Sequence, residues 1–177
     1  MKITIAPYNP NWPMLFEQEK ARIKEALGVH TVSIQHIGST SVPGLGAKPI
    51  IDVMIAVPSL EEADAFCIQP MIALGYEYVK KFEAEIPHRR YFRKSDAAAV
   101  RTHHVHMVVI NSAWWVDHLL FRDFLRSDGD ARRAYEAHKR QLAALEWDDS
   151  NDYAAAKTDF ILKMMDEARA WKQRVCV

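Results

Sequence analysis

The chain has 177 residues, of which 49% are hydrophobic and 26% are charged, an ordinary globular composition that allows a substantial core. Its 23 Lys and Arg residues balance its 23 Asp and Glu residues, so composition excludes a strong overall field toward nucleic acid or an anionic membrane surface. We therefore expect one domain over residues 1–177, with nucleic acid an improbable partner.

The sequence carries no pattern typical of secretion or membrane insertion. Residues 1–7 lack an apolar signal core, and the longest apolar stretch, residues 49–58, is too short to span a bilayer. Cys67 and Cys176 lie far apart, without metal-ligand spacing. These features predict a reduced, cytoplasmic protein with no membrane role.

The first two-thirds of the chain mixes helix and strand patterns. Apolar residues at helical spacing predict a helix over residues 12–27, which Gly28 is placed to end. Strands are expected over 32–37 and 50–57, and a helix over 60–74. Three more strand patterns follow, at 76–80, 89–94 and 103–110.

The last third is helical. Asn111 or Ser112 can cap a helix, residues 128–130 interrupt it, and two further helices are expected over 131–145 and 153–171. The tryptophans at helical spacing are interpreted as core residues: Trp114, Trp115, Trp147 and Trp171. This order predicts an α+β fold, a mixed sheet with covering helices. Its α/β core covers about residues 1–110, and a helical part covers about 111–177.

A glycine-containing segment follows the first strand. Gly38 would let backbone amides approach a phosphate closely, Ser39 and Thr40 add hydroxyl groups, and Lys48 adds a positive charge. The spacing is neither that of a P-loop nor that of the dinucleotide-binding fingerprint. The alternative is a glycine turn in which the serine caps the next helix.

Asp52 lies in the most apolar strand. Alternation places Asp52 and Met54 on one face and Ile51 and Val53 on the other, and both faces read as buried. An ionised carboxylate there is costly unless it is paired, hydrogen-bonded or bound to a metal. Asp52 is therefore a candidate cation ligand or base, and a structural salt bridge with Lys48 or an arginine is the alternative.

The last predicted strand contains His103, His104 and His106. His104 and His106 share one face, where they could bind a metal together with Asp52, or one of them could act as a base. Hydrogen-bonded core histidines are the alternative.

Of Arg89 and Arg90, which point to opposite faces, one could bind phosphate. Lys157, one turn after Tyr153, could reach the same cleft or extend its amine past the core edge.

The stretch HIGSTSVPGL at 36–45, followed by KPIID at 48–52, resembles the GrpB-like family of uncharacterised proteins, which also occurs fused to dephospho-coenzyme A kinase in some bacteria. The likeness continues through RRYFRK at 89–94, THHVH at 102–106 and FRDFLR at 121–126. It extends to Tyr135 with Lys139, Tyr153 with Lys157, and Phe160–Ile161.

This resemblance implies a nucleotidyltransferase-like fold. In that superfamily a Gly-Ser loop holds a triphosphate, and paired carboxylates on the next strand bind two magnesium ions. Gly38 and Ser39 match the loop, and Asp52 matches the first carboxylate. Met54 stands at the second carboxylate position, and His104 or His106 stands where a third would come from a later strand. Tyr153 and Lys157 fall where related enzymes contact the triphosphate.

The leading hypothesis is a nucleotidyltransferase-like protein that binds a nucleoside triphosphate or other phosphorylated ligand with a divalent cation. Its phosphate contacts would be Gly38, Ser39, Thr40, Lys48, Arg90, Tyr153 and Lys157. Asp52, His104 and His106 would be catalytic or would bind the ion, which is Mg or Mn, or Zn, Ni or Fe if the histidines are ligands. The alternatives are a non-catalytic binding module, favoured by Met54, and a metal-dependent enzyme with a remodelled Asp/His site.

Overall fold

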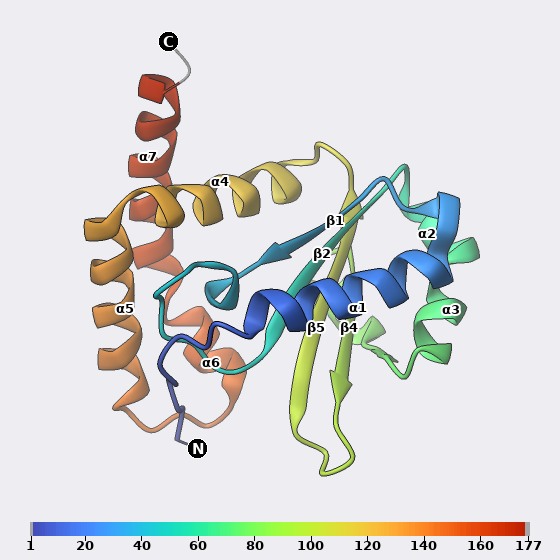
Figure 1. Cartoon of the computed structure of the whole chain (residues 1–177), viewed down its shortest axis with the longest axis horizontal. Helices are drawn as coiled ribbons and strands as arrows, with labels where there is room; N and C mark the ends of the chain where they lie inside the picture. The colour runs from blue at the N-terminus through green and yellow to red at the C-terminus, as the bar shows by residue number, and fades with distance from the viewer. Residues whose placement is uncertain (1, 176–177) are drawn as a thin grey trace.

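The computed structural model describes residues 2–175, apart from the side chains of residues 150 and 151. Its centre is a five-stranded sheet in the order β1-β2-β5-β4-β3 (Figure 1). The strands are β1 Ser33–Ile37, β2 Ile51–Val57, β3 Glu77–Tyr78, β4 Arg89–Ser95 and β5 Arg101–Val109. β2 and β5 run parallel and the other neighbours are antiparallel, so the predicted mixed sheet is confirmed.

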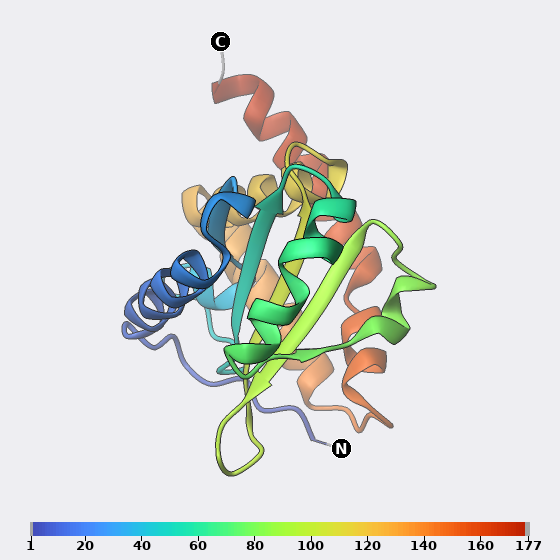
Figure 2. The same cartoon turned by 90° about the vertical axis from the view of Figure 1, so that its right-hand side faces the viewer.

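Three helices cover one face of the sheet. They are α1 Trp12–Leu27, α2 Leu60–Phe66 and α3 Ile68–Ala73. Their apolar side chains pack against the odd-numbered residues of β2, from Ile51 to Val57, as the strand alternation predicts. Figure 2 shows α2 and α3 in front of the sheet. α1 has a proline in its first turn and ends at Gly28, whose φ is 52°.

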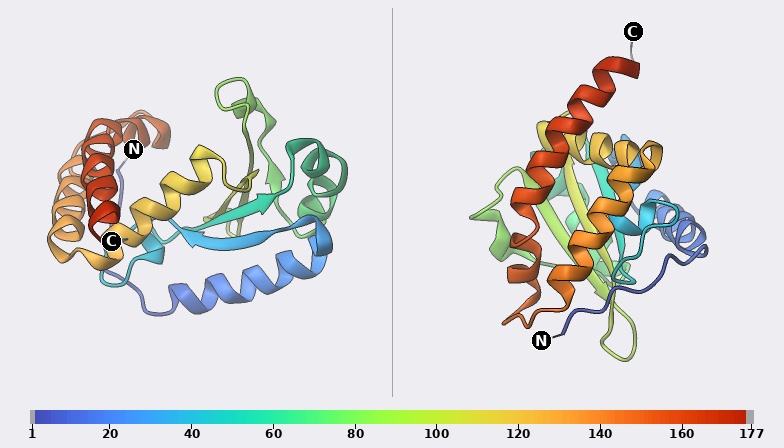
Figure 3. Two further views of the ribbon diagram at one scale, coloured as in Figure 1. Left: turned by 90° about the horizontal axis from the view of Figure 1, so that it is seen from above. Right: turned by 90° about the vertical axis from the view of Figure 1, so that its left-hand side faces the viewer.

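The helical part covers the other face. α4 (Ala113–Ser127), capped by Ser112, packs Trp115 against Met54, Ala56 and Val108 of the sheet. α1 and α4 therefore lie on opposite sides of β1 and β2 (Figure 3). The remaining helices are α5 Gly129–Ala143, α6 Ser150–Ala155 and α7 Thr158–Val175.

The loop between β1 and β2 joins the two parts of the chain. A short 3-10 turn, Ser39–Ser41, follows β1, and Val42 and Leu45 then enter the apolar cluster formed by α4, α5 and α7. Arg126 of α4 donates to the carbonyl of Ser41 at 2.8 Å and 3.0 Å. The helical part and the glycine-containing loop therefore share one core.

Some predicted elements differ from those observed. The helix expected over 60–74 is two helices that meet at Cys67, which leaves Pro70 in the first turn of α3, where its missing N–H costs no helical hydrogen bond. The helix expected over 153–171 is interrupted between Ala155 and Thr158, so Lys157 lies in a turn. The strand expected at 76–80 shortens to two residues, and a 3-10 turn, Lys80–Glu83, follows.

The tryptophan prediction is correct for Trp115, whereas Trp114, Trp147 and Trp171 are only half-buried.

Cys67 is buried with a free thiol, and Cys176 lies outside the described residues. Within residues 2–175, no helix combines the length and the apolar character that a membrane crossing requires.

Gly38 closes the end of β1 against β2. Its φ is 70°, and a Cβ atom at this position would lie 2.3 Å from Oδ2 of Asp52. Any larger residue would be strained twice, first by the left-handed backbone and then by the carboxylate. The loop can approach Asp52 this closely because residue 38 is glycine.

We predict that Gly38→Ala destabilises the protein more than Gly28→Ala. Both glycines have positive φ, which costs an L-residue about 1–2 kcal/mol, but a Cβ at Gly28 meets nothing within 4 Å. Urea unfolding of the two variants measures the difference, which reports the collision with Asp52. Equal losses of stability would show that Asp52 moves aside at no cost.

Candidate functional site

The parallel pairing of β2 with β5 brings the predicted acid and histidines together. Asp52 is paired with His104 and Met54 with His106. Oδ1 of Asp52 lies 3.3 Å from Nδ1 of His104 and 4.0 Å from Nε2 of His106. The side chains of Asp52 and His104 are 27% and 26% exposed, so a ligand can reach them. His104 and His106 lie on one face of β5, as the strand alternation predicts, and Asp52 lies beside them.

The histidines keep Asp52 ionised. Burial alone would raise the pKa of this carboxyl group, but its interactions with His104 and His106 outweigh burial and hold the pKa well below its usual range. Because the ionised carboxylate accepts hydrogen bonds, Nδ1 of His104 acts as the donor. Nε2 of a neutral His104 is then left without a proton.

Arg89 fixes the tautomer of His106. Nη1 of Arg89 lies 3.2 Å from Nδ1 of His106, and an arginine can only donate. Nδ1 must therefore accept, and the ring proton is on Nε2, which faces Asp52. Burial lowers the pKa of His106 to about 4, so the ring is neutral at physiological pH.

This geometry does not suit His106 as a metal ligand. A ligating histidine almost always donates its second ring N–H to an acceptor, whereas the second nitrogen of His106 accepts from an arginine. Among the residues that the structure describes, no three His, Cys, Asp or Glu side chains are arranged to hold an ion. The histidine-ligated metal expected from the sequence therefore lacks support in the side-chain geometry.

Ser39 and Thr40 have different environments. Oγ of Ser39 accepts from Nζ of Lys139 at 3.0 Å. Thr40 is 1% exposed, and its hydroxyl donates to the carbonyl of Ile50 at 3.3 Å while it accepts from Nε2 of His36 at 3.0 Å. The predicted phosphate contact of Thr40 is therefore wrong for its side chain, because its two hydrogen bonds hold the loop to His36 of β1 and to Ile50, the residue before β2.

Lys139 is a member of the site that sequence reasoning missed. It is 2% exposed, and besides Ser39 its amine contacts the carbonyl of Gly46 and lies 4.9 Å from the ring centre of Tyr135. Burial, with a further effect of Lys157, lowers the pKa of Lys139 to about 7. Lys139 follows Tyr135 by four residues and so shares its helix face, which was the available signal.

Lys48 and Lys157 meet at Tyr153. Their amines lie 4.5 Å and 4.7 Å from the centre of its ring. Burial, and next the charge of Lys48, lowers the pKa of Lys157 to about 8, and burial also lowers the pKa of Lys48. Tyr153 is 2% exposed, and its hydroxyl has no hydrogen-bond partner within residues 2–175.

The lysines around the loop lack acidic partners. Within the described residues the ion pairs of lysine involve Lys20 and Lys94, and none involves Lys48, Lys139 or Lys157. Each of these three amines has a lowered pKa because the loss of water on burial outweighs the attraction of the nearest carboxylates, Asp52 for Lys48 and Lys157 and Glu136 for Lys139. We refer to Lys48, Lys139 and Lys157 as the lysine cluster.

Arg90 does not join the site. It lies on the face of β4 opposite to Arg89, where its guanidinium donates to Asp64 at 2.6 Å and 2.8 Å. The predicted phosphate contact of Arg90 is therefore wrong, and Arg89 is the arginine on the histidine face. Strand alternation separates these two residues, but their sequence does not reveal the register between β4 and β5.

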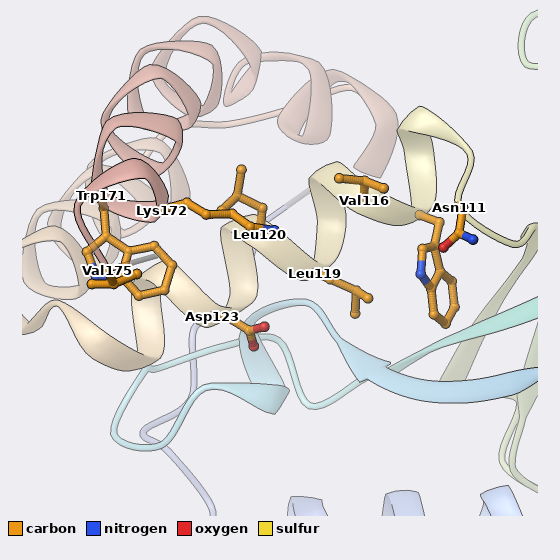
Figure 4. Close-up of a pocket in the computed structure, with 9 residues that line it drawn as sticks. Asn111, Val116, Leu119, Leu120, Asp123, Trp171, Lys172 and Val175 are labelled. Carbon is orange, nitrogen blue, oxygen red and sulfur yellow. The ribbon is translucent and has the colours of Figure 1, made fainter. Parts of the chain in front are cut away.

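A separate hollow, lined by both apolar and polar side chains, lies between α4 and α7. It has a volume of about 350 Å³, and Figure 4 shows Leu119, Leu120 and Val116 on one side and Trp171 on the other. None of its lining residues belongs to the group around Asp52 or to the lysine cluster.

Residues 2–167 match the family model described as GrpB protein. The UPF0157 protein YqkA of Bacillus subtilis is 42% identical over 172 residues; the match covers 97% of this chain and 49% of that relative, so the chain spans about half its length. The crystal structure of the conserved protein GrpB from Enterococcus faecalis is similar at 36% identity and a TM-score of 0.83. The match covers 95% of this chain and 99% of that chain.

A more distant similarity concerns the fold alone. A structure of the Cid1 poly(U) polymerase with Mg 3′-dATP bound is 14% identical, with a TM-score of 0.51, over 80% of this chain and 43% of that one. The fold is therefore nucleotidyltransferase-like. With its sequence match from residue 2 to residue 167, the chain belongs to the GrpB family.

Proposed function

We propose that the protein is a nucleotidyltransferase-like enzyme that binds a nucleoside triphosphate, or another phosphorylated ligand, at Gly38 and Ser39. The lysine cluster is the observation that carries this proposal. Three half-buried or buried amines without carboxylate partners are costly, and an anion with several charges would offset that cost. Triphosphate oxygens would contact Lys139 beside Ser39, and Lys48 and Lys157 at Tyr153.

The proposed divalent cation would arrive with the phosphates. Magnesium is commonly bound by one or two carboxylates together with substrate phosphates, and Asp52 supplies one carboxylate. Oδ2 of Asp52 lies on the Gly38 side, facing the loop, while Oδ1 faces the histidines. When bound, such an ion would neutralise phosphate charge. The buried Met54 offers no oxygen for a second ion.

His104 is the proposed base. Asp52 orients its ring through Nδ1, which leaves Nε2 to accept a proton from the hydroxyl group of an acceptor. The hydroxyl oxygen would bond to the α-phosphorus as the bond from that phosphorus to the pyrophosphate oxygen breaks. Pyrophosphate would leave, and the proton would end on His104. Asp52 itself is a poor base because its pKa is low.

The second candidate is a binding module without turnover. The observation that favours it is Met54, which is 0% exposed and packs with Ile37 and Trp115 in the core where related enzymes have a carboxylate. Such a protein would bind the same ligand through the lysine cluster and leave it unchanged.

Thermal shifts on metal-stripped protein test the proposed function. The panel contains the four nucleoside triphosphates and coenzyme A precursors, each with and without magnesium, manganese or zinc. A triphosphate at about one hundred times its Kd should stabilise the protein by roughly 2.7 kcal/mol. We expect the metal to add to this shift only when the triphosphate is present, and Asp52→Asn to abolish the addition. A shift caused by zinc alone would favour a histidine-ligated metal instead.

A lysine pair provides the matched test of the phosphate site. We expect Lys157→Gln to weaken triphosphate binding about tenfold or more, because one charge-assisted contact is worth about 1.5–3 kcal/mol. Lys163→Gln is the control, because Lys163 is exposed on the following helix and should leave the Kd unchanged. Calorimetric titration gives both values. Equal affinity of the two variants would place the triphosphate elsewhere.

Triphosphate affinity should fall as pH rises from about 7 to 9. The pKa values of Lys139 and Lys157 are about 7 and about 8 in the free protein, and bound phosphate would raise both. Binding above pH 7 must then take up protons, which weakens it by up to about tenfold per pH unit for each lysine. Calorimetry in buffers of different ionisation enthalpy counts these protons, and Lys139→Met should reduce the count. Binding without proton uptake would contradict the role of the cluster.

A further inference from the structure

Arg89 is a guanidinium without an acidic partner. Its neighbours on β4 are paired: Arg90 with Asp64 and Arg93 with Glu77. Within residues 2–175, Arg89 forms no ion pair with a carboxylate, and its buried Nε has no hydrogen-bond partner. Burial lowers the pKa of Arg89, but arginine stays charged in proteins. A positive charge is therefore held in this position without an ion pair, although the more distant charge of Glu85 acts on it.

The side chains in contact with Arg89 are aromatic rings. Its guanidinium carbon lies 4.9 Å from the ring centre of Tyr91. His106 contacts Arg89 on one side and lies 5.0 Å from the ring of Trp114, which in turn stacks on His118 at 3.4 Å. Burial lowers the pKa of His118 as well as that of His106. Neither ring therefore adds a second positive charge beside Arg89.

Arg89 and the lysine cluster lie on different sides of Asp52. β5, which carries His104 and His106, separates β2 from β4 in the sheet. The contacts run from Arg89 to His106, and from His106 and His104 to Asp52. The loop and lysines approach Asp52 from the β1 side instead. A group bound by Arg89 would therefore lie on the histidine side of Asp52.

We propose that Arg89 binds the anionic group, a carboxylate or a phosphate, of the second substrate, and so presents that substrate's nucleophile to His104. This inference rests on the proposed function, because it assigns the acceptor of the same reaction. It defines the acceptor as a small anionic molecule that bears a hydroxyl or amine. The aromatic walls give low local dielectric, which strengthens the contact between the guanidinium and the anion.

Side-chain nitrogen NMR tests the inference directly. In protein labelled with ¹⁵N arginine, the Nε–H signal of Arg89 is identified by its absence in Arg89→Lys. Inorganic phosphate and acetate are then titrated at constant ionic strength, and they distinguish the two sources of anion. We expect one of them to shift the Arg89 signal to saturation. If neither anion moves it, the inference is wrong.

Two variants separate this result from the proposed function. Lys157→Gln should leave the anion titration of the Arg89 signal unchanged, and Arg89→Gln should leave the Kd for a triphosphate within about twofold. Loss of triphosphate binding in Arg89→Gln would assign Arg89 to the triphosphate and overturn the acceptor subsite. If no triphosphate binds the parent protein while the Arg89 signal still saturates, the proposed function fails and the anion site remains.

Discussion

The close approach of the Gly38 backbone to the carboxylate of Asp52 is the constraint from which the site follows. A Cβ at residue 38 would lie 2.3 Å from Oδ2, so the loop can lie against Asp52 only with glycine there. Past this point the chain inserts Val42 and Leu45 into the helical core. The same loop therefore brings α5 to the site, and Lys139 reaches Ser39 from α5. The position of this loop thus fixes both the Gly38 backbone, on the proposed phosphate side of Asp52, and the buried amine of Lys139.

Charge is distributed asymmetrically around Asp52. On one side, amines without carboxylate partners surround Ser39 and Tyr153. On the other side, His104 and His106 face the carboxylate, and the guanidinium of Arg89 contacts His106. One carboxylate between two cationic regions leaves the protein short of negative charge locally, although its formal net charge is +0. The missing charge is what anionic ligands would supply, which is why overall composition gives no indication of the binding chemistry.

The sequence predicted the features that depend on local periodicity, such as which residues share a face of a strand. It did not predict contacts that depend on how distant segments pair. Alternation placed Asp52 in the interior of the sheet and put His104 and His106 on one face, because strand geometry is fixed by the backbone. Choosing Arg89 rather than Arg90 requires the register between β4 and β5, which no local sequence pattern contains. The phosphate contact predicted for Thr40 is wrong for a similar reason. Its hydroxyl is hydrogen-bonded to His36 and to the carbonyl of Ile50, which lies ten residues away in the sequence. The break before α7 lacks a glycine or proline, so its position also depends on packing.

Met54 and His106 limit the chemistry that the side chains around Asp52 can perform. Met54 is buried against Trp115 and Ile37, so replacing it with a carboxylate would place a charge in an apolar cluster. His106 beside it accepts from Arg89 and donates toward Asp52, an arrangement that serves to orient the carboxylate. Among the described residues, Asp52 is the carboxylate in contact with His104 and His106, and Met54 offers no oxygen beside it. In the proposed transfer, the lysine cluster and the cation at Asp52 would stabilise the charge of the triphosphate, while Arg89 would hold the acceptor on the histidine side of Asp52.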